Sequence, residues 1–149
     1  RIHPSTYELQ APLSPHEAAR LEGLRLDMNQ FKLPTTDNNL VVEGAGGVLV
    51  PINEGALMID LIDQLDLPVV VVARSGLGTI NHTLLTLEAL RARNLELLGV
   101  IVSGPANSAN IEAIRTYGKI KILLELEPIS PLDSAGIDIA AKNLESEFS

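Results

Sequence analysis

The chain has 149 residues, of which 46% are hydrophobic and 20% are charged, so its length and composition predict one domain with a substantial apolar core. It carries 11 Lys and Arg against 19 Asp and Glu, a net charge of −8, which argues against a surface that neutralises nucleic-acid phosphates or anionic lipids. The sequence contains no cysteine. This excludes disulfides, thiolate metal sites and a cysteine nucleophile, and it fits a reducing compartment.

Short apolar runs alternate with helical periodicity along the chain, a pattern typical of an α/β protein with a parallel sheet. The first predicted helix begins at Ser14, with Pro15 at its first position and Glu17 completing a capping box. The other predicted elements, in chain order, are a buried strand at 40–43, an extended piece at 48–52, a helix at 56–65, a strand at 68–73, a helix at 78–93, a strand at 97–102, a helix at 110–117, a strand at 120–124 and an amphipathic helix at 137–148.

Two of these elements carry more detailed expectations. The strand at 68–73 is apolar at every position, which predicts burial on both faces between helices. In the helix at 78–93, Leu85 is expected to widen an apolar stripe. That stripe consists of Ile80, Leu84, Leu87 and Arg91.

The first candidate for chemistry is the segment LVVEGAGG at 40–47. A buried strand would deliver the Glu43 carboxylate to the edge of the sheet where α/β folds bind ligands. Carboxylate oxygens suit Mg²⁺, and the glycines at 44, 46 and 47 would let backbone amides approach an anion. The alternative is a strand capped by a tight turn, with Glu43 solvated.

The second candidate is the segment GLGTINHTLL at 76–85, where a strand runs through a glycine loop into a helix. The amides of Gly78, Thr79, Ile80 and Asn81 would lie at the positive end of the helix dipole and could bind an anion. The alternative is an ordinary helix start, capped by Thr79, with the glycines forming the turn.

The chain contains no G-x-x-x-x-G-K-[ST] phosphate loop, since Gly118 and Lys119 are followed by Ile120. It also begins with Arg1 rather than Met, so we expect a segment upstream.

Three segments, taken together, resemble the dethiobiotin synthetase family. They are Y-x-x-x-x-P-L-S-P-H at 7–16, VVEGAGG-x-x-x-P at 41–51 and LPVVVVARSGLGTINHTLLTLEALR at 67–91. The resemblance covers residues 7–128. It implies a P-loop NTPase-like fold of the SIMIBI type, a parallel sheet flanked by helices on both faces. It also implies that residues 1–149 form the C-terminal portion of a single domain, with the first strand, the P-loop and the catalytic lysines upstream.

The resemblance implies roles for particular residues. Glu43 would ligate Mg²⁺ beside ATP. The nucleotide would contact Glu43, Gly44, Ala45, Gly46, Ser103, Gly104, Pro128, Ile129 and Ser130. The substrate would contact Ser14, Gly47, Pro51, Gly78, Thr79, Ile80 and Asn81. Ser103 stands where the family commonly has Asn, which leaves the preference among nucleotides open.

The implied enzyme is a cytoplasmic cyclo-ligase of biotin biosynthesis, active only with the P-loop segment. It would use ATP, Mg²⁺ and CO₂ or bicarbonate to convert 7,8-diaminononanoate to dethiobiotin. In this family the active site lies at a homodimer interface, and neither nucleic acid nor membrane is a partner. One alternative is a non-catalytic regulatory or dimerisation domain in a longer polypeptide. Another is a related P-loop amidoligase or partition ATPase.

Overall fold

The computed structural model describes residues 2–147. The chain divides into two compact units, one formed by residues up to 69 together with 86–97, the other by residues 70–85 and those from 98 onward. Among the described residues, no helix combines the length and the apolar character needed to cross a membrane.

The second unit contains most of a three-stranded sheet with the strand order β3-β4-β5. The sheet and the helices that connect its strands are β3 (Val69–Arg74), α3 (Thr79–Ala92), β4 (Leu97–Ser103), α4 (Ser108–Gly118) and β5 (Ile122–Leu126), and α3 from residue 86 onward belongs to the first unit. β4 and β5 pair in parallel, with Val100 opposite Ile122 and Ser103 opposite Leu126. Each strand is joined to its neighbour through a helix, as parallel pairing requires. The predicted parallel α/β sheet with flanking helices is therefore confirmed.

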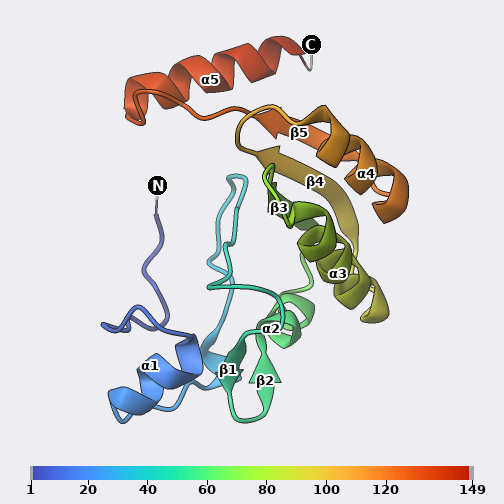
Figure 1. The fold of residues 1–149 in the computed structure, drawn as a ribbon. Helices are drawn as coiled ribbons and strands as arrows, with labels where there is room; N and C mark the ends of the chain where they lie inside the picture. Colours follow the sequence, from blue (N-terminus) through green and yellow to red (C-terminus); the bar gives the residue numbers. More distant parts are fainter. Residues whose placement is uncertain (1, 148–149) are drawn as a thin grey trace. The chain divides into compact units, whose positions relative to one another are not determined.

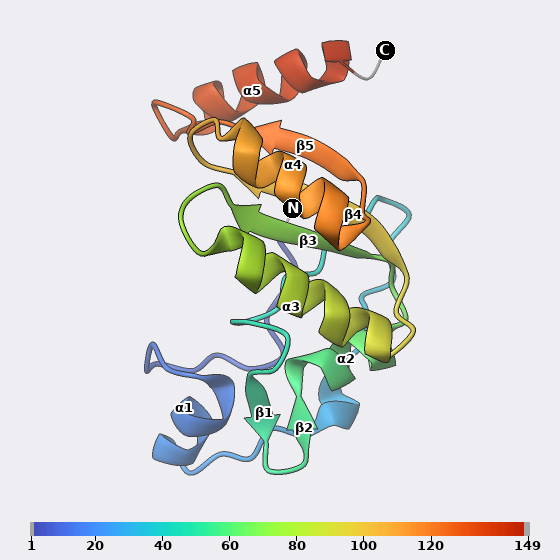
Figure 2. The ribbon, with the colours of Figure 1, turned by 45° about the vertical axis from the view of Figure 1, so that its right-hand side comes forward.

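Helices α3 and α4 lie on the same face of this sheet (Figures 1 and 2). Two consecutive crossovers of the same hand in the same direction along a sheet place both helices on one side. The side chains of β3 alternate accordingly: Ala73 is 7% exposed, whereas Val70 and Val72 are 38% and 68% exposed. The expectation that this strand is buried on both faces is therefore wrong, because α3 and α4 cover only one of them.

Helix α3 confirms the predicted helix at 78–93 within one residue at each end. Its buried stripe differs from the prediction and consists of Thr79, Thr83, Leu87 and Leu90. Leu85, expected to widen the apolar face, is 56% exposed. Two of these four buried residues are threonines, and hydrophobicity alone does not identify them as buried.

The three following elements were predicted in the right order with shifted boundaries. β4 extends the predicted strand at 97–102 by one residue, α4 begins two residues before the predicted helix at 110–117, and β5 begins two residues after the predicted start at 120. The C-terminal helix α5 (Ser134–Glu147) begins three residues before the predicted helix at 137–148. Phe148, the last residue of that predicted helix, lies outside the described residues.

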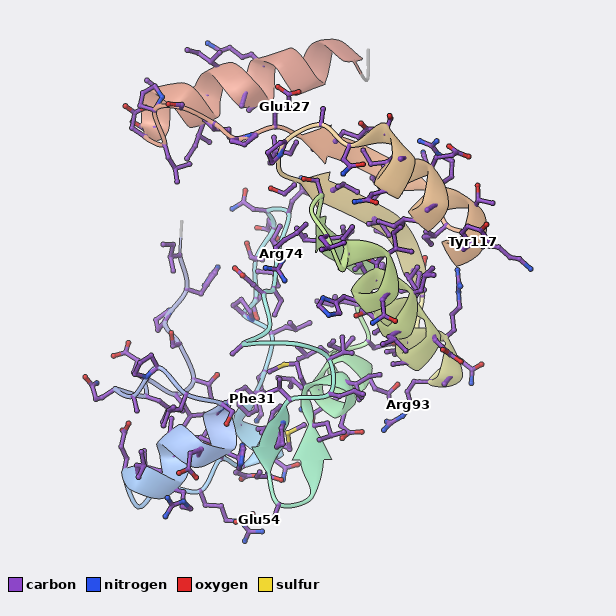
Figure 3. The ribbon with its side chains drawn as sticks, viewed as in Figure 1. Phe31, Glu54, Arg74, Arg93, Tyr117 and Glu127 are labelled. Carbon is purple, nitrogen blue, oxygen red and sulfur yellow. The ribbon has the colours of Figure 1, made fainter. Side chains whose placement is uncertain are left out.

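The first unit contains two helices, a 3-10 turn and a small antiparallel hairpin. These are α1 (Pro15–Leu21), η1 (Met28–Gln30), β1 (Pro51–Asn53), β2 (Ala56–Leu57) and α2 (Met58–Leu65). Their core contains Ala19, Leu26, Ile52 and Met58. The rings of Phe31 (labelled in Figure 3) and Tyr7 pack beside it with their centroids 5.5 Å apart.

The hairpin changes two predicted boundaries in this unit. The helix expected at 56–65 begins at Met58, because Ala56 and Leu57 pair with β1. The extended piece expected at 48–52 becomes a turn, in which the Val50 amide donates to the Gly47 carbonyl at 3.0 Å, followed by β1.

The prediction of a buried strand at 40–43 is wrong. Residues 40–43 form no strand, and Val41 and Val42 are 91% and 47% exposed. A strand needs a neighbour for its amides and carbonyls, and the two sheets of the described chain consist of β1 to β5 only. The apolar sequence therefore lacks the partner that would turn it into a buried strand.

Candidate functional site

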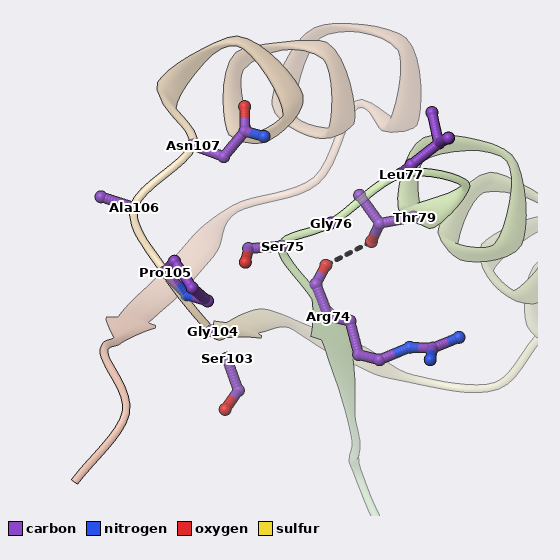
Figure 4. Close-up of a pocket in the computed structure, with 10 residues that line it drawn as sticks. All are labelled: Arg74, Ser75, Gly76, Leu77, Thr79, Ser103, Gly104, Pro105, Ala106 and Asn107. Atoms are coloured by element: carbon purple, nitrogen blue, oxygen red, sulfur yellow. Dashed lines mark hydrogen bonds between the residues drawn. The ribbon is translucent and has the colours of Figure 1, made fainter. Parts of the chain in front are cut away.

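A pocket of about 380 Å³ lies in the second unit, where the loops that follow β3 and β4 meet (Figure 4). It is lined by Arg74, Ser75, Gly76, Leu77, Thr79, Ser103, Gly104, Pro105, Ala106 and Asn107. The carboxyl ends of parallel strands are the edge at which open α/β sheets bind ligands. The volume lies within the range of small-molecule pockets.

The loop between β3 and α3 is fastened by Thr79, whose side chain is buried. Its hydroxyl donates a hydrogen bond to the carbonyl oxygen of Arg74, the last residue of β3 (dashed in Figure 4). The Thr79 amide donates to the Gly76 carbonyl at 3.2 Å, and Gly78 has a φ of +89°, a backbone conformation that favours glycine. The Thr79 hydroxyl thus bonds to the preceding strand, which differs from the expected cap. The expectation that all four amides could bind an anion is wrong for Thr79, whose amide is already bonded.

The loop that follows β4 touches the loop that follows β3 through Gly104. A Cβ added at Gly104 would overlap the Ser75 hydroxyl and lie 3.3 Å from the Ser75 Cβ, and the φ of Gly104 is +139°. On its other side, the Gly104 amide donates to the Leu126 carbonyl at the end of β5, at 2.9 Å. Glycine at position 104 therefore allows the ends of β3, β4 and β5 to lie close together.

Asn110, in the first turn of α4, connects the same two loops. Its side-chain amide donates to the Ser75 carbonyl at 2.8 Å and to the Gly76 carbonyl at 3.5 Å. Its backbone amide donates to the Asn107 side chain at 3.1 Å, and Asn107 thereby caps α4. The backbone and the side chain of Asn110 thus serve two separate interactions.

The structure brings several predicted site residues together at this edge. Ser103 is the last residue of β4 and Gly104 follows it, and Pro128 to Ser130 follow β5 after one intervening residue. Because Ser103 lies opposite Leu126 in the parallel pair, both segments leave the sheet at the same edge. Thr79 lines the pocket from the neighbouring loop, and Gly78, Ile80 and Asn81 flank it along the chain.

The other predicted site residues belong to the first unit. The Glu43 carboxylate is exposed. A Cβ at Gly44 would lie 3.0 Å from the Met58 sulfur, and Gly46 has a φ of +83° with Val50 at 3.0 Å from its Cβ position. Ala45 and Gly47 are exposed, and Gly47 has open space at its Cβ position. The glycines therefore fit a tight turn packed against α2.

Ser14 and Pro51 lie at the starts of α1 and β1. Ser14 precedes α1 with extended backbone angles, but its side chain makes no capping hydrogen bond. Glu17 instead forms two hydrogen bonds with Arg20 at 2.7 Å, so the predicted helix start is confirmed and the predicted capping box is wrong. The hydrogen bond from Arg20 lowers the pKa of Glu17. Pro51 begins β1 opposite Leu57.

Mg²⁺, which the resemblance implies, fits the donor chemistry of Glu43. Mg²⁺ commonly uses one or two carboxylates together with waters and substrate phosphates, so a single exposed carboxylate beside a glycine turn is suitable. Among the side chains that the structure describes, no cluster of three or more His, Asp or Glu could hold a metal without such help.

Sequence reasoning missed seven of the ten residues that line the pocket, and it also missed Asn110. Arg74 and Asn107 line the pocket, and Asn110 supports its wall. Each lies at or shortly after the carboxyl end of a strand, a position that could have drawn attention to it. The pairing of Asn110 with Ser75, 35 residues away, left no local signal.

The parallel sheet with a loop-lined pocket at its carboxyl edge is typical of nucleotide-binding α/β domains. Consistent with this class, a family model described as "AAA domain" matches residues 1–135. The chain is 59% identical over 137 residues to an ATP-dependent dethiobiotin synthetase BioD from Paramagnetospirillum magneticum, covering 92% of this chain and 67% of that protein. It is 50% identical to the enzyme of the same name from Lawsonia intracellularis, covering 89% of this chain and 64% of that protein.

A biotin biosynthesis bifunctional protein BioCD from Bordetella avium is 54% identical to the chain over 144 residues. That alignment covers 97% of this chain but only 31% of the longer protein. The chain belongs to the ATP-dependent dethiobiotin synthetase family, and it spans about two thirds of the length of the single-function relatives. The names of these relatives do not favour the non-catalytic alternative.

Proposed function

We propose that this chain is the C-terminal portion of a dethiobiotin synthetase, which closes the ureido ring of dethiobiotin from 7,8-diaminononanoate, CO₂ and ATP. The observation that carries the proposal is the 59% identity over 92% of the chain to a relative named for this activity. Activity requires the P-loop and its lysines, which would be supplied by a segment upstream of residue 1.

The reaction needs positioning and charge neutralisation more than it needs a protein nucleophile. One amine of the substrate is carboxylated by CO₂, and ATP phosphorylates the resulting carbamate. The second amine then attacks this mixed anhydride, which closes the ring and releases phosphate. Holding the two amines, the carbamate and the γ-phosphate in one orientation supplies much of the rate. Amides and cations directed at the phosphates supply the rest.

In this proposal the glycine-containing segments at 40–47 and 76–85 bind different parts of the reactants. The Glu43 carboxylate holds Mg²⁺, which would neutralise phosphate charge when bound, and Gly44, Ala45 and Gly46 line the γ-phosphate and the diamine. Ser103 and Gly104, with Pro128 to Ser130, border the base. Their convergence at one sheet edge supports this role. The loop at 78–81 receives the substrate carboxylate, and Ser14, Gly47 and Pro51 complete the substrate site.

The proposed enzyme is a cytoplasmic homodimer, in which the loop at 78–81 serves the active site of the neighbouring subunit. The exposure of Leu77 supports this arrangement, because this large apolar side chain at the tip of the loop is fully exposed. Burying such a residue at an interface would be favourable.

The test is a product assay with the full-length protein from the encoding gene. Incubation with 7,8-diaminononanoate, bicarbonate and MgATP should yield dethiobiotin and phosphate in equal amounts, detected by mass spectrometry and a phosphate assay. A gene without an upstream G-x-x-x-x-G-K-[ST], or a full-length protein that forms no product at saturating substrate, would support the non-catalytic alternative.

The role of Glu43 is tested by Glu43→Gln, which keeps the size of the side chain and removes its charge. We expect kcat to fall by about 100-fold at fixed Mg²⁺, the size of effect seen when one preorganised electrostatic contact is lost. More Mg²⁺ should also be needed for half-maximal rate. Glu54→Gln is the matched control, since Glu54 (Figure 3) is an exposed carboxylate of the same unit whose 3.6 Å ion pair with Arg25 is also exposed. Equal kinetics for the two variants would remove Glu43 from the metal site.

A further inference from the structure

The Asn110 side chain holds the start of the loop that leads into α3. Its amide donates to two consecutive backbone carbonyls, those of Ser75 at 2.8 Å and Gly76 at 3.5 Å. Ser75 is itself buried, with 4% of its surface exposed. The first of these bonds is therefore made in a partly desolvated place, where losing a partner costs more than it does in water.

The other end of the same loop is held by Thr79. Its hydroxyl bonds to the Arg74 carbonyl, and its side chain is 5% exposed. The segment from Ser75 to Thr79 is thus fastened at both ends, by α4 through Asn110 and by β3 through Thr79. Between these two points Leu77 is exposed and Gly78 adopts a positive φ.

We propose that Asn110 is a positioning residue for the substrate carboxylate. By holding the carbonyls of Ser75 and Gly76, it fixes the direction in which the loop presents the amides of Gly78, Ile80 and Asn81, the Thr79 amide being bonded to the Gly76 carbonyl. This inference rests on the proposed function, in which these amides bind the carboxylate. A loop fixed before binding loses less conformational freedom when the ligand arrives, so the affinity is higher.

The chemistry of the contact requires an amide rather than a carboxylate. The Asn110 NH₂ group faces two carbonyl oxygens, both acceptors. Asn110→Asp keeps the shape but places a negative oxygen against them, which replaces attraction with repulsion. The capping bond from the Asn110 backbone amide to Asn107 does not involve this side chain, so the start of α4 is retained in the variant.

The kinetic test uses the full-length enzyme and compares KM values for its two large substrates. Asn110→Asp and Asn110→Ala should raise KM for 7,8-diaminononanoate about fivefold or more, the ratio that corresponds to one lost hydrogen bond of about 1 kcal/mol. KM for ATP should change less than twofold. Ala109→Gly is the matched control, since it weakens the same exposed turn of α4 without touching the loop.

A second measurement does not depend on activity. Hydrogen exchange followed by mass spectrometry should show faster exchange in the peptide covering residues 74–79 of Asn110→Asp, and wild-type exchange there in Ala109→Gly. Unchanged exchange in Asn110→Asp overturns the positioning role, as does an equal effect in the control.

The outcomes separate the two proposals. A wild-type enzyme that forms no dethiobiotin overturns the proposed function and the positioning role with it. An active wild type, together with an Asn110→Asp variant that has unchanged KM for the diamine, overturns the positioning role alone. Parallel increases in both KM values would also overturn it, because they would indicate a general structural effect.

Discussion

Replacing Gly104 by alanine tests how closely the ends of β3 and β4 approach. The added Cβ would overlap the Ser75 hydroxyl and lie 3.3 Å from the Ser75 Cβ and 3.5 Å from its backbone nitrogen. Since Ser75 is buried, its side chain has little room to move away. The φ of +139° adds backbone strain, because residues with a Cβ rarely adopt it.

The two effects set the expected magnitude. A strained φ costs about 1–3 kcal/mol, and overpacking of a close contact costs about 1–3 kcal/mol. Gly104→Ala should therefore lower the free energy of unfolding by about 2–6 kcal/mol. That is a large part of the total stability of an ordinary domain, which is about 5–15 kcal/mol.

The assay is urea denaturation followed by circular dichroism, with Gly76→Ala as the matched control. Gly76 lies in the same pocket, but its Cβ position is open and its φ is not in the positive range, so alanine there should change stability by less than about 1 kcal/mol. In a double-mutant cycle, Ser75→Gly should restore the part of the unfolding free energy that Gly104→Ala loses to the steric overlap. The part lost to the strained φ of residue 104 should remain.

Two results would refute this reasoning. A Gly104→Ala variant within about 0.5 kcal/mol of wild type, the range typical of neutral surface substitutions, would show that the two strand ends do not touch. A cycle without coupling between positions 75 and 104 would show that any loss comes from the backbone alone.

The remaining predictions concern the contributions of Asp60 and Leu90 to stability. The Leu57 amide donates to Asp60 at 2.7 Å, and this bond, followed by the one from Arg93 (Figure 3), lowers the pKa of Asp60. A lowered folded-state pKa gives stability that is present above the unfolded value and lost as pH falls through the folded one. Asp60→Asn should therefore be less stable than wild type at pH 7, and thermal melts at several pH values should show this difference vanishing below pH 3.8, the ordinary value. A difference independent of pH would contradict the assignment. Leu90→Ala should cost about 2–5 kcal/mol in urea denaturation, because Leu90 is fully buried. The same change at Leu85, which is 56% exposed, should cost less than about 1 kcal/mol, and equal costs would count against the observed helix face.

Much of the second unit could be predicted from the sequence. The apolar run that forms β3, the helical periodicity of α3 and the glycine loop between them are local signals, and all three elements are present in the structure. The order of strands and helices also predicted a parallel sheet. The resemblance placed Ser103 and Gly104 among the nucleotide-binding residues, and the structure places them at the pocket.

The segment at 40–43 shows where local reasoning fails. Its sequence is as apolar as that of a buried strand, yet it forms none, because strand structure depends on a neighbour that local sequence does not supply. The buried stripe of α3 fails for a related reason. Thr79 and Thr83 are polar by composition, but they are buried on the inner side of the helix.

The sequence by itself determined the alternation of elements, the position of the glycine turns and membership of a family, because these depend on residues close together in the chain or on motifs in a fixed order. Only the tertiary structure decided which face of β3 is covered, that Gly104 lies against Ser75, and that Asn110 bonds to a carbonyl 35 residues earlier. Such contacts join residues distant in sequence, and their free energy depends on a geometry that exists only after the chain has folded.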